Sequence, residues 1–128
     1  MNPLGIFMNF WEKNWDADHC KYIRKAAALG YDILEFQAQP LLEMTDEKIR
    51  SLKSLADGLG IQLTYSLGLD PHYDVSSLDE TVRQRGVRYL QDILRKIQVG
   101  GGRLLSGVSY AGWGTPGVIL DSKEPYLE

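Results

Sequence analysis

Residues 31–67 read YDILEFQAQPLLEMTDEKIRSLKSLADGLGIQLTYSL, and their pattern indicates the fold class more clearly than any other part of the sequence. Its two ends, 31–37 and 61–67, are short and rich in residues that favour strands. Between them Thr45 is a typical helix N-cap, and apolar residues then recur at helical spacing: Ile49, Leu52, Leu55, Ala56 and Leu59. A strand, a helix and a second strand in this order predict two parallel strands joined by a right-handed crossover.

The strand predicted at 31–37 alternates in polarity. Ile33, Glu35 and Gln37 face one side, and the apolar Leu34 and Phe36 face the other. A carboxylate inside an apolar strand must be paired, hydrogen-bonded or functional. We expect a structural partner for Glu35, either a neighbouring polar side chain or an arginine.

The same alternation continues on both sides of this stretch. Further strands are predicted at 4–10 and 104–109, a helix at 18–29, and a longer helix that starts at a capping box of Ser77 and Glu80. The triplet Gly100–Gly102 follows a helix and precedes a strand. It therefore predicts a helix-to-strand turn, because a phosphate loop has the opposite order. The complete order is β-α-β-α-β-α-β, an α/β fold with a parallel sheet.

The composition excludes several classes of protein. The chain has 128 residues, a formal net charge of −3, 44% hydrophobic residues and a single cysteine, Cys20. We therefore expect no nucleic-acid partner, no membrane partner and no disulfide framework. Without a recognisable signal peptide, a cytoplasmic location is the expectation.

Candidate functional residues lie where parallel strands end, because ligands bind beyond the carboxyl ends of such strands. All three tryptophans, Trp11, Trp15 and Trp113, occur in these loops and predict an aromatic pocket lining. His19 and His72 lack the spacing of a metal pair, so each is expected to be solvated or locally hydrogen-bonded. Cys20 reads as a buried helix position. These residues contain no complete catalytic set.

Five segments, taken in order, carry a family resemblance. They are GIFMNFW at 5–11, LGYDILE at 29–35, YDVSSLDETVRQRG at 73–86, SGVSYAGW at 106–113 and KEPY at 123–126. The series resembles the ketose 3-epimerases of the D-tagatose 3-epimerase and D-psicose 3-epimerase type. Phe7 is more similar to the tagatose branch, because the psicose branch usually has tyrosine at this position.

The resemblance implies a (β/α)8 TIM barrel of the xylose isomerase-like superfamily. It implies an isomerase of carbohydrate metabolism that epimerises free ketohexoses at C3 through an enediolate. A divalent metal, Mn²⁺ or Co²⁺, holds the sugar oxygens, and two glutamates act as acid and base. The implied substrate-binding positions are Phe7, Trp15, Ser66, Val108 and Trp113. None of these side chains supplies a catalytic proton or binds metal.

The implied metal ligands and both glutamates belong to strands beyond the fourth, so we expect no catalytic residue and no metal ligand in this chain. Residues 1–128 are then expected to be an N-terminal half-barrel with four strands, truncated and inactive on its own. Its open sheet edges predict a homo-oligomer. Two alternatives stay open: a non-catalytic half-barrel that self-associates, and a related sugar-phosphate isomerase or dehydratase.

Overall fold

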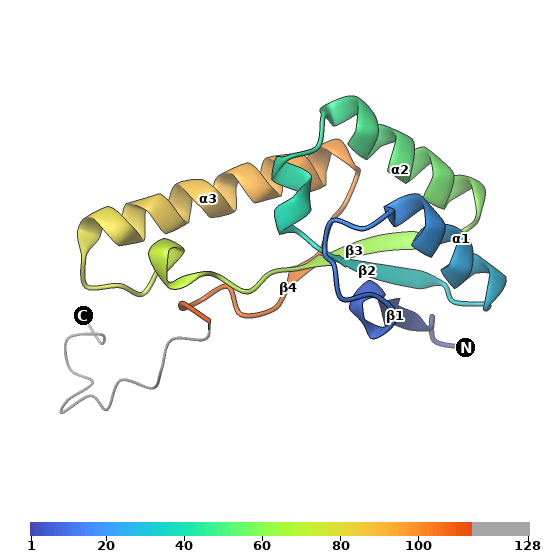
Figure 1. Cartoon of the computed structure of the whole chain (residues 1–128), viewed down its shortest axis with the longest axis horizontal. Coiled ribbons are helices and arrows are strands. Elements are labelled where there is room, and N and C mark those ends of the chain that lie inside the picture. Colours follow the sequence, from blue (N-terminus) through green and yellow to red (C-terminus); the bar gives the residue numbers. More distant parts are fainter. Residues whose placement is uncertain (114–128) are drawn as a thin grey trace.

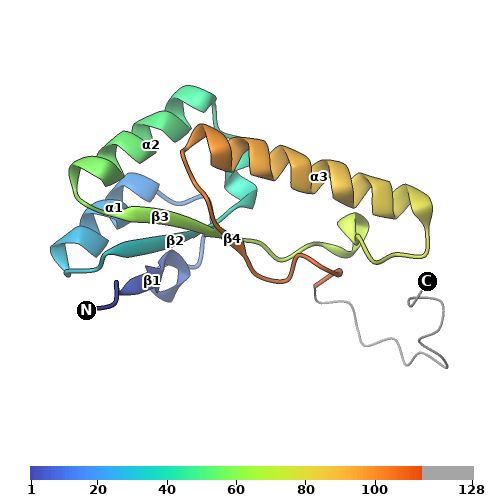
Figure 2. The same ribbon diagram turned by 180° about the vertical axis from the view of Figure 1, so that it is seen from behind.

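Three helices cover one face of a four-stranded sheet. The computed structural model describes residues 1–113, and Figures 1 and 2 show α1, α2 and α3 together on one side of the strands. The order along the chain is β1 (Gly5–Phe7), η1 (Met8–Phe10), α1 (His19–Ala28), β2 (Ile33–Gln37), η2 (Gln39–Leu42), α2 (Asp46–Gly58), β3 (Gln62–Ser66), η3 (Pro71–Tyr73), α3 (Glu80–Val99) and β4 (Leu105–Ser106). The predicted alternation of strands and helices is confirmed.

The sheet is parallel throughout, with the strand order β1-β2-β3-β4. Each strand lies beside its neighbour in sequence, as short right-handed crossovers require. In the register, Glu35 lies opposite Thr64 and Gln37 lies opposite Ser66. Residues that are opposite in register point to the same face, so the polar residues of β2 and β3 share one side of the sheet.

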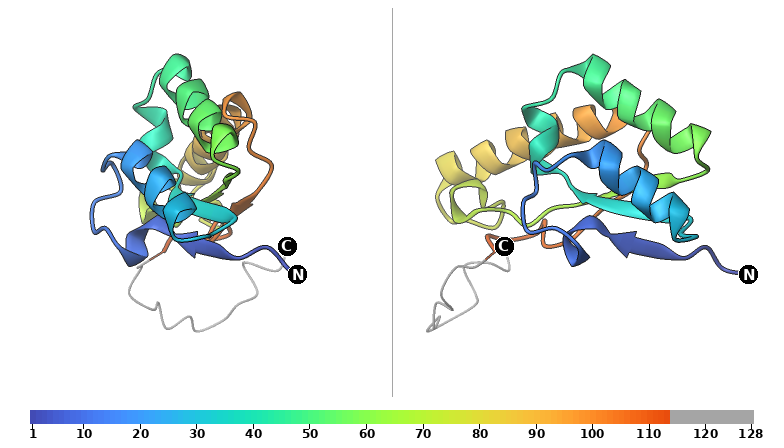
Figure 3. Two further views of the ribbon diagram at one scale, coloured as in Figure 1. Left: turned by 90° about the vertical axis from the view of Figure 1, so that its right-hand side faces the viewer. Right: turned by 45° about the vertical axis from the view of Figure 1, so that its right-hand side comes forward.

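The hydrophobic core lies between the sheet and the helices. Leu34 and Phe36 of β2 are 0% and 1% exposed, which confirms that this face of the strand packs inward against the helices. Ile23 of α1, Ile49 of α2 and Ile93 of α3 complete the same core. The opposite face of the sheet carries no helix in the described part of the chain, as the side views of Figure 3 show.

The first and last strands are shorter than predicted. β1 ends at Phe7 because residues 8–10 turn into a 3-10 helix, in which Met8 becomes fully buried. The amide of Asn9 donates to the Glu12 carbonyl and stabilises this turn. β4 ends at Ser106 because Gly107 has a φ of 102°, which an extended strand cannot contain.

The predicted capping box at the start of α3 is wrong. Asp79 is the N-cap, and its carboxylate accepts from the backbone N–H groups of Thr81 and Val82. The Ser77 hydroxyl instead accepts from the Asp79 N–H, two residues too early in the sequence to cap the helix. A carboxylate is a better match than a hydroxyl for the positive end of a 20-residue helix.

The other predicted helix ends are confirmed. Thr45 accepts from the Lys48 N–H and caps α2. Gly30 and Gly60 follow α1 and α2 with φ values of 80° and 71°, the left-handed conformation that commonly ends a helix. Gly100–Gly102 forms the predicted turn between α3 and β4. In residues 1–113, no helix is long and apolar enough to cross a membrane.

Candidate functional site

A cavity lies at the carboxyl end of the sheet, where function is expected in a parallel α/β fold. It has a volume of about 180 Å³, and we call it the tryptophan cavity. Its lining residues are Trp15, Gln37, Ser66, Leu67, Gly68, Gly107, Val108 and Trp113. Four of the five substrate-binding positions implied by the resemblance, namely Trp15, Ser66, Val108 and Trp113, therefore meet in one place.

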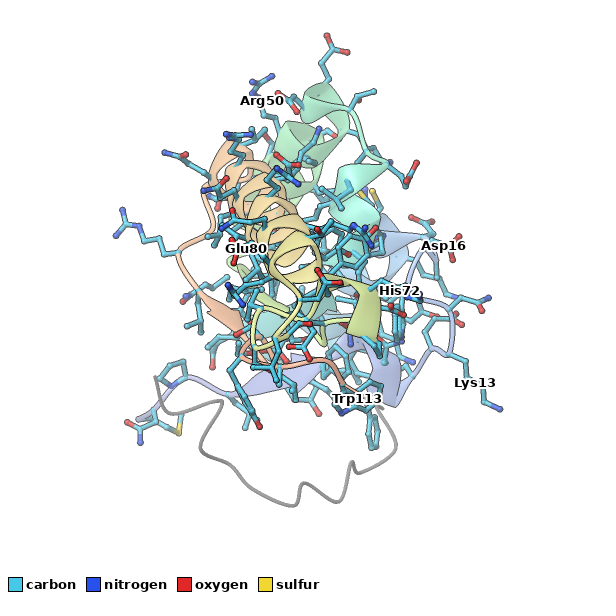
Figure 4. All side chains as sticks on the ribbon, turned by 90° about the vertical axis from the view of Figure 1, so that its left-hand side faces the viewer. Lys13, Asp16, Arg50, His72, Glu80 and Trp113 are labelled. Atoms are coloured by element: carbon cyan, nitrogen blue, oxygen red, sulfur yellow. The ribbon has the colours of Figure 1, made fainter. Side chains whose placement is uncertain are left out.

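The exit of β4 places Trp113 and Val108 in this cavity. Gly107 packs so closely that an added Cβ would lie 2.4 Å from the Leu67 carbonyl oxygen. The Leu69 N–H donates to the Val108 carbonyl, which continues the pairing beyond the end of β4. A Cβ on Gly68 would make an ordinary van der Waals contact with Trp113 at 3.5 Å, which places Gly68 directly beside the indole. Figure 4 shows Trp113 on the side of the sheet away from Arg50 of α2.

The three tryptophans of the strand-end loops do not act together. Trp15 and Trp113 line the tryptophan cavity and are 41% and 62% exposed, so neither residue is buried in the core. Trp11 instead packs near the start of α1, stacked on Tyr22 with ring centroids 6.2 Å apart. Lys25 lies 4.5 Å above the Trp11 ring centroid. The predicted aromatic lining thus holds for two tryptophans, and the third is structural.

The floor of the cavity is polar. Gln37 and Ser66 lie side by side on β2 and β3, and Gln37 Oε1 and Ser66 Oγ are buried without a hydrogen-bond partner in residues 1–113. A buried, unpaired polar group costs about 1–3 kcal/mol. The alternation in the sequence places Gln37 on the polar face of its strand, but nothing in the sequence marks it as a site residue. The register with Ser66, which the sequence does not show, is what brings it into the site.

Further unpaired polar atoms lie near the same end of the sheet. In the described part of the chain they are Asn9 Oδ1, Gln39 Oε1 and His19 Nε2. Asn9 follows β1 and Gln39 follows β2, so their amide oxygens lie beyond the strand ends. Buried polar atoms without a hydrogen-bond partner are rare in folded proteins, and each one calls for an explanation such as a catalytic role or a bound water or ion. Their concentration here supports this end of the sheet as the functional end.

Phe7 is the one implied substrate-binding residue that does not line the tryptophan cavity. It lies opposite Glu35 in the sheet register. It borders a separate hollow of about 320 Å³ on the open face of the sheet, together with Gly5, Ile6, Ile33, Glu35, Thr64 and Leu104. Phe7 therefore lies nearer the middle of the strands than the other four residues.

Glu35 has the structural partner that the sequence predicts. Ser106 Oγ donates to Glu35 Oε2 at 3.2 Å. The carboxylate is half-buried on the open face of the sheet, one pleat below Gln37. Because it already accepts a hydrogen bond within the sheet, Glu35 reads as part of the framework under the cavity.

The two histidines differ in their surroundings. His72 is exposed. Its backbone N–H donates to Asp70 Oδ1, and its Nδ1 lies 2.6 Å from the same oxygen; these two contacts, the backbone one first, hold the pKa of Asp70 below its usual range. His19 is 4% exposed and packs edge-on against Phe36 with centroids 4.5 Å apart. Burial lowers the pKa of His19, although a local hydrogen bond to the Ala17 backbone opposes this shift. Cys20 is half-buried beside the core.

The described residues do not fit a metal ion. Within residues 1–113, no three His, Cys, Asp or Glu side chains lie close enough to form a ligand group. The tryptophan cavity itself is lined by aromatic, amide, hydroxyl and aliphatic groups. Carboxylate and imidazole ligands, which Mn²⁺ and Co²⁺ prefer, are therefore not gathered at this site.

A larger hollow of about 530 Å³ lies at the amino end of the sheet. Its lining includes Lys53, Asp57 and Arg103, and Lys53 already pairs with Asp57 along α2. This end of a parallel barrel contributes to stability, whereas the loops at the carboxyl end carry the chemistry. The smaller tryptophan cavity is therefore the better candidate for a functional site.

Comparison with protein families agrees with this fold. Residues 23–121 match the family model described as the xylose isomerase-like TIM barrel. The chain belongs to this family. The four strands and three helices described above are thus part of a xylose isomerase-like barrel, and the resemblance drawn from the sequence is confirmed at this level.

Relatives of this xylose isomerase-like chain are named as 3-epimerases of ketoses. This chain is 38% identical over 109 residues to a D-psicose 3-epimerase from Ruminiclostridium cellulolyticum, and the matched region covers 85% of this chain and 37% of the relative. This chain is also 34% identical over 115 residues to an L-ribulose 3-epimerase from Mesorhizobium japonicum, and that match covers 89% of this chain and 38% of the relative. The placement of Phe7 in a tagatose branch stays a prediction.

A solved structure extends the similarity to three dimensions. A D-psicose 3-epimerase with D-tagatose from Clostridium cellulolyticum H10 matches with a TM-score of 0.91 and 34% identity, over 98% of this chain and 43% of that one. The chain thus spans about two fifths of the length of these relatives. Residues 114–128, which include the KEPY segment, lie outside the described residues.

Proposed function

We propose that this chain is the N-terminal half of a ketose 3-epimerase barrel, and that its tryptophan cavity binds part of a free ketose. One observation carries the proposal: Trp15, Ser66, Val108 and Trp113 gather around a single cavity at the carboxyl end of the strands. Indole faces stack on the C–H groups of a sugar, while the polar floor matches its hydroxyl groups.

In this proposal the chain binds and orients the sugar but does not move the proton at C3. The family resemblance assigns that step to two glutamates and a divalent metal, Mn²⁺ or Co²⁺, which polarises the carbonyl when bound. The described residues hold no such ligand group. Their contribution is to exclude water with the two indoles and to fix the sugar against the sheet.

A free ketose fits the cavity better than a sugar phosphate. Its lining contains no lysine and no arginine among the described residues. A phosphate group binds to such cations or to backbone N–H groups at a helix start. A related sugar-phosphate isomerase of the same barrel is therefore the weaker alternative.

The open sheet supports a second proposal, that isolated copies of the chain self-associate. β1 and β4 are the edges of the sheet in the described chain, so each has one unpaired side. Leu4 and Leu104, next to these edges, are 60% and 51% exposed. An unpaired edge strand can form hydrogen bonds with a strand of another copy of the chain, and a two-fold dimer is the simplest assembly that pairs these edges. A monodisperse monomer in light scattering at micromolar concentration would contradict this proposal.

The epimerase proposal is tested with a chimera. Residues 1–113 are joined to the remaining part of the D-psicose 3-epimerase from R. cellulolyticum and incubated with Mn²⁺ and D-fructose. We expect the C3 epimer to form, and we expect a Trp113→Ala chimera to lose at least about tenfold in kcat/KM. A Trp11→Phe chimera is the matched control, because Trp11 lies outside the cavity.

Two results would contradict the proposal. The first is a folded chimera that binds Mn²⁺ but does not convert D-fructose, D-tagatose or D-psicose. The second is turnover by the 128-residue chain alone, because the proposal places no acid–base pair in it. Chromatographic separation of the ketoses after incubation measures both outcomes.

A further inference from the structure

Gln37 and Ser66 form a neutral polar pair on the floor of the tryptophan cavity. They are opposite in the register of two parallel strands, so their side chains share the open face of the sheet. Both residues line the cavity. Gln37 Oε1 and Ser66 Oγ are buried, and neither atom has a hydrogen-bond partner in residues 1–113.

The neighbouring polar side chains make their hydrogen bonds to other groups, and not to Gln37 Oε1 or Ser66 Oγ. Glu35, one pleat lower, accepts from Ser106. Asn9 donates to the Glu12 carbonyl, and Gln39 donates weakly to the Gly68 carbonyl at 3.5 Å. Strand pairing also holds the backbone of both residues before any ligand binds, because Gln37 is paired with β3 and Ser66 is paired with both β2 and β4.

The chemistry of the pair matches one hydroxyl group. An amide oxygen accepts a hydrogen bond, and a serine hydroxyl can both donate and accept. A sugar hydroxyl is also donor and acceptor at once, so it can bind both residues together. A charged group would not be satisfied here, because the described lining of the cavity has no ionisable partner for it. The indoles of Trp15 and Trp113 supply apolar walls for the C–H groups beside such a hydroxyl.

We propose that Gln37 is a specificity-determining residue, which with Ser66 binds one particular hydroxyl group of the ketose. This inference rests on the proposed function of the cavity. In this role Gln37 adds a polar side chain that distinguishes between sugars to a site whose other expected residues are aromatic, aliphatic or small. A site that pairs with a hydroxyl rejects an analogue that lacks it, because its own buried polar atoms are then left unpaired.

The test uses the full chain and three variants. Gln37→Met keeps the length and shape of the side chain but removes the amide, and Ser66→Ala removes the hydroxyl. Gln62→Met is the matched control, because Gln62 belongs to the same sheet but is exposed at the opposite end of β3. Binding of D-fructose, D-tagatose and their monodeoxy analogues is followed by ligand-observed NMR, and folding is followed by thermal unfolding.

We expect wild type to bind one monodeoxy analogue about five- to tenfold more weakly than the parent ketose. Gln37→Met should weaken binding of the parent ketose by a similar factor and abolish this discrimination, while Gln62→Met retains both. The melting temperature of Gln37→Met should stay equal or rise, because the variant removes a buried unpaired group. A purely structural glutamine would give the opposite change in stability.

The possible failures are distinguishable. If wild type binds no ketose, both the proposed function of the cavity and this inference are overturned. If wild type binds ketoses but Gln37→Met binds and discriminates equally well, only the inference is overturned. A Gln37→Met chain that is unfolded or strongly destabilised also overturns it, because Gln37 would then be a framework residue.

Discussion

Ser106 of β4 donates to Glu35 of β2 although β3 lies between these two strands. The hydrogen bond crosses the open face of the sheet and joins residues 71 positions apart in the sequence. It lies directly below the polar floor formed by Gln37 and Ser66. The short fourth strand is thereby attached to the rest of the sheet by a side chain as well as by its backbone.

Replacing this serine is expected to weaken the sheet. Ser106→Ala removes the donor to Glu35 and should lower the free energy of unfolding by about 1 kcal/mol, measured by urea denaturation. Ser51→Ala is the control, since its hydroxyl donates only to the Lys48 carbonyl on the exposed surface of α2. A loss for Ser106→Ala no larger than for Ser51→Ala would show that the Glu35 contact is energetically neutral.

Substitutions can distinguish between two capping residues at the start of α3, Asp79 and Ser77. Asp79→Ala should lower the free energy of unfolding by about 1 kcal/mol, because two backbone N–H groups lose their acceptor. Ser77→Ala should cost less than about 0.5 kcal/mol, because Ser77 caps no helical N–H group. The reverse order of these two losses would support the capping box that the sequence suggests and would contradict the structure.

The sequence predicts most of this fold because its patterns are local. The alternation in 31–37 and the helical spacing around Ile49 are properties of neighbouring residues, so they survive in the structure. The predicted strand ends are wrong where contacts between residues far apart in the sequence determine the structure. β1 ends early because Met8 turns into the core, and β4 ends early because Gly107 must fit against Leu67.

The same difference between local patterns and distant contacts applies to the candidate site. The family resemblance indicates Trp15, Ser66, Val108 and Trp113, and the structure gathers them around one cavity. In the sequence Gln37 is only a polar position of a strand, because the register between β2 and β3 is what brings it beside Ser66. Register depends on backbone pairing between strands, which a single sequence does not display.

Gly107 is expected to tolerate no side chain. Gly107→Ala combines a left-handed φ of 102° with an overlap against the Leu67 carbonyl, and should cost at least about 2 kcal/mol. Gly30→Ala is the matched control, since its φ is 80° but nothing lies within 4 Å of the added Cβ. It should cost only about 1 kcal/mol of backbone strain. Equal losses in thermal unfolding would contradict the close approach of β3 and the exit of β4.

His19 should make the fold sensitive to mild acid. Its pKa is lowered mainly by burial and also by nearby Lys48, while Asp16 and Asp18 oppose the shift. The unfolded chain therefore binds the proton first, and stability falls as the pH drops below the ordinary histidine value of about 6.5. The loss is at most about 1.4 kcal/mol per pH unit for one group.

The measurement is the melting temperature between pH 7.5 and pH 5. His19→Gln should flatten this dependence relative to the wild-type chain, because the variant removes the buried imidazole. The carboxylates with lowered pKa values, Glu12, Asp46 and Asp70, contribute only at lower pH, where they become protonated. An unchanged pH dependence in His19→Gln would contradict the burial of a neutral imidazole.

Two-dimensional NMR of the 15N-labelled chain would show whether the tryptophan cavity binds a ketose. On titration with D-fructose or D-tagatose, we expect shifts of the indole N–H signals of Trp15 and Trp113 and of the side-chain amide of Gln37. The indole signal of Trp11 should stay in place. Shifts confined to Lys53, Gly101 and Arg103 at the opposite end of the sheet, or no shifts at saturating sugar, would mean that the tryptophan cavity does not bind the ketose.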